Sequence, residues 1–227
     1  GYRRISGFQN DYGTVPGTGA VLGVNVNGNM DDGIFACRKP TSGTDYLYKW
    51  NAGTSSWDAI TSVGSPSMTS VSRIRFVNYN WSGEVMLLTD GQNPAATYDG
   101  TTYTQLTHAN APTNPKFAEE FASHIFLAGD SSDPYNLHFS APLNAVDFSP
   151  ANGAGVINVA STITGLAVYR DTLIIFCTDR ILKLTGSSSA DFSLSSLTSA
   201  LGCLETDSIR EVGGDVMFLA PDGLRTL

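Results

Sequence analysis

The feature that most constrains this chain is an internal repeat of about 45 residues. Four aspartates mark the repeat, Asp90, Asp130, Asp179 and Asp222, and their separations are 40, 49 and 43 residues. A short apolar cluster precedes each aspartate, at residues 85–88, 125–127, 173–176 and 216–219. Clusters of this length, rich in β-formers and bounded by turn residues, are typical of buried strands.

Each cluster belongs to a larger unit. An apolar residue stands thirteen positions before each aspartate, at Val77, Phe117, Leu166 and Ile209, with turn residues such as 81–83 or 213–215 in between. A third strand follows the aspartate, most clearly at 181–184 and 223–227. In two copies a Gly turn then leads to an aromatic residue, Trp57 or Tyr103, which predicts a fourth strand.

Four antiparallel strands in about 45 residues are the size of a propeller blade. The sequence therefore predicts an all-β fold, a β-propeller of four-stranded antiparallel blades. We expect a lead-in segment at 1–18 and a propeller at 19–227 with five blades. These blades are expected near 19–62, 70–108, 115–150, 160–200 and 205–227, the last with about three strands. Either the N-terminal stretch supplies the missing strand, or further chain follows Leu227.

One segment carries two conflicting patterns. Between Lys116 and Phe126 the apolar residues recur at helical spacing, at positions 117, 118, 121, 122, 125 and 126. The repeat instead places a strand, a turn and a second strand here. We give the repeat more weight, because it rests on four copies.

Composition narrows the range of functions. The chain has 13 Lys and Arg against 21 Asp and Glu, a net charge of −8, so reading of DNA through a basic face is not expected. An acidic surface is compatible with the wall of a passage through which DNA moves without being bound. The longest purely apolar run, 173–177, is far shorter than the roughly 20 residues of a membrane span, so no membrane insertion is predicted.

The sequence contains no phosphate-binding loop, nucleophile elbow or zinc-protease helix motif. Its three cysteines have no zinc or redox spacing and are interpreted as small core residues, and its three histidines are interpreted as isolated polar side chains. We therefore predict no catalytic, cofactor-binding or metal-binding residues, no cofactor and no enzyme activity. The residues considered are Cys37, Cys177, Cys203, His108, His124 and His138.

Two further sets of residues bear on sugar chemistry. Glu119 and Glu120 are adjacent, so on a strand they point to opposite faces and do not form a glycosidase pair with each other. Large aromatic side chains serve either as a sugar-binding platform or as core residues of the blades, and we favour the core interpretation. These aromatics are Trp50, Trp57, Trp81, Tyr98 and Tyr103.

Two stretches resemble propeller-containing virion proteins of tailed bacteriophages. Residues 1–8, Gly-Tyr-Arg-Arg-Ile-Ser-Gly-Phe, are similar to the start of such proteins. The stretch from Gly202-Cys203 through 212–219 to 222–224 is similar to one of their later blades. The resemblance implies a nozzle-type tail component that assembles as a ring, contacts neighbouring tail proteins and surrounds the DNA channel. It supplies no catalytic residues.

The first hypothesis is therefore a structural subunit of the virion tail, in a homo-oligomeric ring through which DNA passes without specific binding. Loops longer than hairpins require, at 25–33 and 186–191, would serve its contacts. The alternative is a carbohydrate-binding propeller that recognises a host surface. A glycoside-cleaving enzyme is the third and least favoured hypothesis, because no paired-carboxylate motif supports it.

Overall fold

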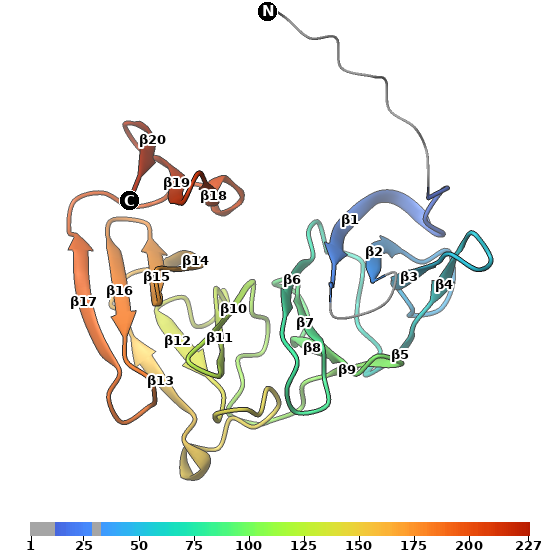
Figure 1. Cartoon of the computed structure of the whole chain (residues 1–227), viewed down its shortest axis with the longest axis horizontal. Helices are drawn as coiled ribbons and strands as arrows, with labels where there is room; N and C mark the ends of the chain where they lie inside the picture. The colour runs from blue at the N-terminus through green and yellow to red at the C-terminus, as the bar shows by residue number, and fades with distance from the viewer. Residues whose placement is uncertain (1–11, 29–32) are drawn as a thin grey trace, which may run out of the picture.

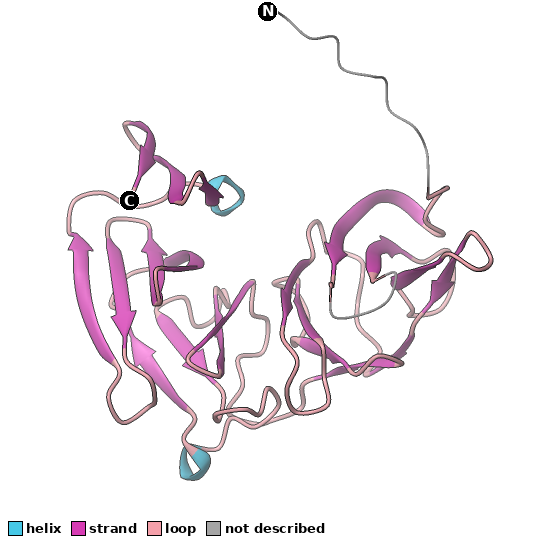
Figure 2. Ribbon diagram, viewed as in Figure 1, coloured by secondary structure: helices cyan, strands magenta, loops and turns pink. Residues whose placement is uncertain are grey.

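The computed structural model describes residues 12–28 and 33–227, and within them the chain is an all-β propeller of five blades (Figures 1 and 2). The predicted fold class is confirmed. Residues 1–8, which carry part of the family resemblance, and residues 29–32 of the loop at 25–33 lie outside the described residues. No helix in the described ranges is long and apolar enough to span a membrane.

Blades 1 and 2 come from the first half of the chain. Blade 1 contains β1 (Thr18–Val26), β2 (Ile34–Lys39), β3 (Leu47–Asn51) and β4 (Ser56–Ala59). Blade 2 contains β6 (Arg75–Asn78), β7 (Met86–Thr89), β8 (Ala96–Tyr98) and β9 (Thr102–Gln105). A fifth strand, β5 (Thr61–Val63), comes from the connection between these blades and pairs in parallel with β9. It covers the outer edge of blade 2.

The remaining blades follow in chain order. Blade 3 contains β10 (Phe117–Phe121), β11 (His124–Ala128), β12 (Asn136–Phe139) and β13 (Gly155–Asn158), so it extends past the expected end at residue 150. Blade 4 contains β14 (Ile163–Tyr169), β15 (Thr172–Cys177), β16 (Ile181–Thr185) and β17 (Ser193–Thr198). Blade 5 has three strands, β18 (Arg210–Val212), β19 (Asp215–Ala220) and β20 (Gly223–Thr226). Two short 3-10 helices, η1 (Pro150–Asn152) and η2 (Thr206–Ser208), lie in the connections.

The blades form an arc around a common centre, with an opening between blade 5 and blade 1 (Figure 1). The first antiparallel strand of each blade lies innermost, and the chain passes from the outside of one blade to the inside of the next. In blades 2, 3 and 4 the second strand is buried on both faces because a blade packs on each side. Residues 173–176 of β15 are at most 2% exposed, as their continuous apolar pattern predicted.

Two-residue turns join the first and second strands of blades 3, 4 and 5, and in blade 2 such a turn lies at the tip of the longer connection 79–85. Their central residues all have positive φ, at Ser82-Gly83, Ala122-Ser123, Arg170-Asp171 and Gly213-Gly214. Paired positive φ angles match the right-handed twist of a hairpin, as in type I′ turns. The turn at 122–123 lies inside the segment with helical spacing, where Phe121 pairs with His124 across the hairpin. The prediction of strand, turn and strand is thus confirmed there.

Two of the repeat aspartates, Asp90 and Asp130, organise the turns that follow the second strands of blades 2 and 3. Asp90 accepts hydrogen bonds from the backbone N–H of Gln92 (2.7 Å) and Asn93 (2.8 Å). Asp130 accepts from the N–H of Ser132 (2.9 Å) and, in the connection from blade 2, of Asn114 (2.8 Å). Short polar side chains satisfy backbone donors at such reversals. The other two repeat aspartates, Asp179 and Asp222, instead form ion pairs with the side chains of Arg180 and Arg225.

The end of the lead-in segment packs on blade 1. Val15 is buried against Ala36 and Tyr48, and the indole N–H of Trp57 donates to the carbonyl oxygen of Tyr12 (2.7 Å). This segment covers the outer part of the blade 1 face that points away from blade 2. The inner part of that face, on β1, remains exposed.

Candidate functional site

The innermost strands of the five blades surround a central cavity of about 770 Å³. Residues of β1, β6, β10 and β14 line it together with η2 and the start of blade 5. Its wall mixes apolar side chains with charged ones of both signs. The charged residues of this central channel are Arg73, Arg75, Glu119, Asp207, Arg210 and Glu211.

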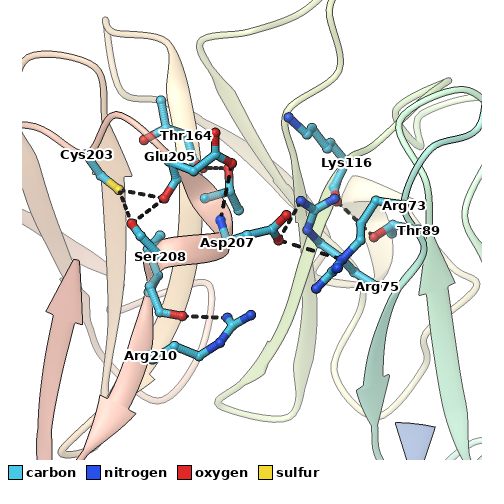
Figure 3. A network of polar contacts seen from close by, with 12 residues as sticks. Arg73, Arg75, Thr89, Lys116, Thr164, Cys203, Glu205, Asp207, Ser208 and Arg210 are labelled. Atoms are coloured by element: carbon cyan, nitrogen blue, oxygen red, sulfur yellow. Dashed lines mark hydrogen bonds and ion pairs between the residues drawn. The ribbon is translucent and has the colours of Figure 1, made fainter. Parts of the chain in front are cut away.

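An ion pair crosses the central channel between blade 2 and blade 5 (Figure 3). Arg75 Nη2 lies 2.9 Å from Asp207 Oδ1, and Arg73 Nε lies 3.8 Å from the same oxygen. The guanidinium of Arg75 also lies over the ring of Phe117, with Cζ 5.6 Å from its centroid. An Arg stacked on an aromatic ring and paired with a carboxylate is held in one orientation, so this pair ties the fifth blade across the channel.

The short helix η2 holds Asp207 in place. Its N-cap residue is Glu205, whose side chain accepts from the backbone N–H of Asp207. The hydroxyl of Thr206 donates to the carbonyl oxygen of Thr164 on β14, and the hydroxyl of Ser208 donates to that of Glu205. Figure 3 labels Thr164, Glu205, Asp207 and Ser208, and the bond between Thr206 and Thr164 anchors η2 to blade 4. The carboxylate is thereby directed at blade 2.

Glu119 is the most perturbed carboxyl group of the channel wall. Burial beside the channel, and then the charge of Glu120, raise the pKa of Glu119 to about 7. The register places Glu119 opposite Phe126 and Glu120 opposite Ile125, on opposite faces of the hairpin as predicted. Glu120 accepts from the N–H of Ser123 in the turn (3.2 Å). Glu119 and Glu120 therefore do not form a two-carboxylate pair with each other.

The three histidines lie apart from one another. His108 Nε2 lies 3.6 Å from Asp147 Oδ1, His124 is buried with Nδ1 against the carbonyl oxygen of Ser140, and His138 Nε2 lies 2.8 Å from Asp133 Oδ2. Within residues 12–28 and 33–227, no group of three or more His, Cys, Asp or Glu is placed to hold a metal ion. Each histidine has its own structural partner.

Two smaller cavities lie away from the centre. One, of about 430 Å³, is bounded by the loop at 109–113 and by Asp130, Asp133 and His138. The other, of about 460 Å³, lies beside Trp50 and Asn51 at the outer strands of blade 1. The carboxylates of both accept hydrogen bonds from neighbouring protein groups: Asp133 from Asn136, Asp130 from Ser132, and Asp58 from Asn51.

The cysteines and most of the aromatics are core residues, which confirms their interpretation. Cys37, Cys177 and Cys203 are buried and free, and burial raises the pKa of the Cys177 thiol to about 11. Trp50, Tyr98 and Tyr103 are at most 8% exposed. Trp57 packs edge-on against Trp50, and Trp81 against Tyr79. These rings fill blades rather than form a platform for sugars.

The sequence did not point to Arg73, Arg75 or Asp207. Asp207 lies at the start of the fifth repeat unit and is not one of the repeat aspartates. Arg73 precedes β6 and Arg75 begins it, and the repeat pattern marks only the apolar positions of that strand. Nothing in their local spacing indicates that they meet. Glu119 was considered for chemistry, but only in combination with Glu120.

Comparison with known proteins gives the fold and no more. No family model and no curated protein matches this chain. Among solved structures, the extracellular domain of BT4673 from B. thetaiotaomicron superimposes with a TM-score of 0.51 at 10% identity, over 91% of this chain and 31% of that one. BBS1N in complex with ARL6DN superimposes with a TM-score of 0.51 at 10% identity, over 93% and 66%. This chain thus spans less than two thirds of either structure, and the similarity establishes a β-propeller fold.

Proposed function

We propose that this chain is a non-catalytic structural subunit of a bacteriophage tail, of the nozzle type, in a homo-oligomeric ring that surrounds the DNA passage of the virion. The single observation that carries the proposal is the surface of the two end blades. Blade 1 and blade 5 each expose an apolar face of the kind that blades bury elsewhere in the fold. Exposed apolar faces on a rigid scaffold are typical of assembly surfaces. The resemblance at 1–8 and 202–224 supports the tail as the place of that assembly.

The central channel of one propeller is not a passage for DNA. The ion pair between Arg75 and Asp207 crosses it, and Phe117 and Ile209 are among the residues that line it. DNA would run through the ring of subunits, along their outer surfaces. The net charge of −8 favours passage without phosphate contacts.

The proposed function is tested with phage particles that lack this chain. We expect filled heads and tails without the distal ring, with DNA that leaks or is not delivered, and rescue by the chain supplied in trans. The purified protein, incubated with capsule or cell-wall polysaccharide of the host, is expected to release no reducing ends. Complete tails in the absence of the chain would overturn the proposal, and so would sugar release that one carboxylate substitution abolishes.

A further inference from the structure

The negative charge of the chain is concentrated in its middle. Residues 76–169, which include all of blade 3 and nearly all of blade 2, contain eight Asp and Glu and one basic residue, Lys116. Almost all of the net charge of −8 therefore lies in this segment. Lys116 belongs to the inner end of blade 3, where its Nζ lies 5.3 Å from the ring centroid of Phe117 on β10. The outer strands of blade 3 have no Lys or Arg of their own.

One of the two smaller cavities, with a volume of about 430 Å³, lies in this acidic region. It is bounded by the outer strands β12 and β13, by the turn before β12, and by the connection from blade 2 to blade 3. All the residues of its wall lie between 109 and 156, so the wall contains neither end of the chain nor any residue outside the described ranges. A cavity of this volume is in the range of small-ligand sites. We call it the blade 3 cavity.

Hydrogen bonds hold the wall of the blade 3 cavity in place. The side-chain N–H of Asn110, in the connection from blade 2, donates to the carbonyl oxygen of Phe148 (3.2 Å). The backbone N–H of Asn114 donates to Asp130 Oδ2 (2.8 Å), and the backbone N–H of Ser132 donates to Asp130 Oδ1 (2.9 Å). The connection is thus bonded to blade 3 at two points, so the cavity is formed before any ligand enters.

Two carboxylates line the blade 3 cavity. Burial raises the pKa of Asp130, but hydrogen bonds from the N–H of Asn114 and from the N–H and hydroxyl of Ser132 outweigh burial, and its pKa lies below the ordinary value. Asp130 is therefore charged at neutral pH although it is only 2% exposed. The side chain of Asp133 is 35% exposed. Within residues 12–28 and 33–227, no Lys or Arg forms an ion pair with either carboxylate.

His138, which also lines the cavity, has one ring nitrogen without a partner. Its Nε2 lies 2.8 Å from Asp133 Oδ2, and an ionised carboxylate only accepts, so Nε2 carries the proton and donates. In the neutral ring Nδ1 is then an acceptor. Nδ1 is buried and has no hydrogen-bond partner among the residues that the structure describes. A buried acceptor of this kind is stabilised by an N–H donor.

We propose that the blade 3 cavity binds a primary alkylammonium group, supplied either by a free aliphatic diamine or by a lysine side chain of a partner protein. Its three N–H donors suit Asp133 and His138 Nδ1 together, and its positive charge offsets carboxylates that have no Lys or Arg partner. Its aliphatic chain suits the apolar part of the wall, formed by Pro112, Pro150 and Val156. An anionic ligand would be repelled. The inference is independent of the proposed function, because it uses only groups of this cavity.

The test titrates the purified whole chain with amines and follows the backbone amide signals by ¹H–¹⁵N NMR. The probes are 1,4-diaminobutane, for a free diamine, and N-acetyl-lysine methylamide, for a lysine side chain. Tetramethylammonium chloride at the same ionic strength carries the charge without N–H donors, and 1-butanol carries the chain without the charge, so neither should bind. For the better amine we expect saturable shifts in residues 109–113 and 130–138 with a Kd of about 1 mM.

Three variants locate the binding. Asp133→Asn keeps the shape of the side chain and removes its charge, so the affinity for the amine should fall at least tenfold. Asp58→Asn is the matched control, because Asp58 also accepts a hydrogen bond from an asparagine, Asn51 (2.7 Å), at the wall of the other small cavity. Val156→Lys places a competing ammonium group at the blade 3 cavity, from a residue that is 50% exposed, and should abolish binding. Circular dichroism establishes that each variant is folded, and if Asp133→Asn does not fold, Val156→Lys decides.

Saturable binding of either amine, lost in the Asp133→Asn and Val156→Lys proteins and kept in the Asp58→Asn protein, supports the inference. Binding of the diamine alone assigns the cavity to a free amine, and binding of the lysine derivative alone assigns it to the side chain of a partner. No saturable binding of either amine up to about 50 mM overturns the inference. Equal binding of tetramethylammonium, or an equal loss in the Asp58→Asn protein, overturns it as well.

Discussion

Arg75 and Asp207 lie 132 positions apart in the sequence, yet Arg75 Nη2 lies 2.9 Å from Asp207 Oδ1 across the central channel. The pair connects the second blade to the fifth, whose apolar core is shared with blade 4 alone among the clusters of the described residues. The pair therefore links η2, which leads into blade 5, to the first half of the arc.

Replacing Asp207 with Asn should loosen blade 5. The substitution removes the charge that Arg73 and Arg75 share, and both partners are partly exposed, so we expect a loss of about 1 kcal/mol in the free energy of unfolding. Hydrogen exchange of residues 204–227 should accelerate about fivefold. Asp222→Asn is the control, since the pair with Arg225 lies within blade 5 and is half exposed. Equal effects of both substitutions would contradict the role of the channel pair.

Replacing Ile175 with Asp should unfold or severely destabilise the propeller. Ile175 is fully buried in β15 between blades 3 and 4, and an unpaired carboxylate there costs about 4 kcal/mol or more. Urea unfolding followed by circular dichroism measures the loss. Ser195→Asp on exposed β17 should change stability by less than about 0.5 kcal/mol. A folded Ile175→Asp protein of normal stability would show that β15 is not a central strand.

The turns of the inner hairpins predict substitutions with opposite effects on the free energy of unfolding. Ala122 and Ser123 have φ of 50° and 62°, so Ala122→Asn with Ser123→Gly should stabilise the protein by about 1 kcal/mol. Gly214 has φ of 82° with open space around its Cα, so Gly214→Val should destabilise by a similar amount through backbone strain alone. Thermal unfolding measures both. A gain from Gly214→Val would mean that the turn has another conformation.

Glu119 predicts a dependence of stability on pH. Its pKa is raised to about 7 in the folded protein and is about 4.3 when unfolded, so the folded state binds more protons between these values. Stability should therefore fall as the pH rises from about 4.5 to about 7 and change little from this group above that, by about 1–3 kcal/mol in total. Glu119→Gln should abolish this fall, whereas Glu211→Gln, on an exposed residue, should leave it in place. The same slope in the Glu119→Gln protein would assign it to another group.

Sequence reasoning located the blades because the second strands of four of them are short apolar clusters that are followed by an aspartate. It did not determine which way each strand faces. The residues thirteen positions before the aspartates are not equivalent: Phe117 pairs with Ala128 and Leu166 with Ile175, because hairpin register and bulges differ between blades. The short parallel strand β5 has no apolar alternation and left no pattern to detect.

The central channel could not be predicted for a different reason. Its ion pair depends on how five inner strands converge, and the sequence pattern describes each strand alone. The pKa of Glu119 depends in the same way on burial beside the channel. The lack of a known catalytic motif could be predicted from the sequence. The contact between Arg75 and Asp207 could not, because it forms only in the assembled fold.

The most direct measurement of the central claim is a cryo-electron microscopy reconstruction of the intact tail in which this chain is placed. We predict several copies related by rotation around the DNA passage, each burying on the order of 1,000 Å² against a neighbour. A single copy, or a spike at the periphery attached only by its stalk, would contradict a ring subunit and would favour a receptor-binding propeller.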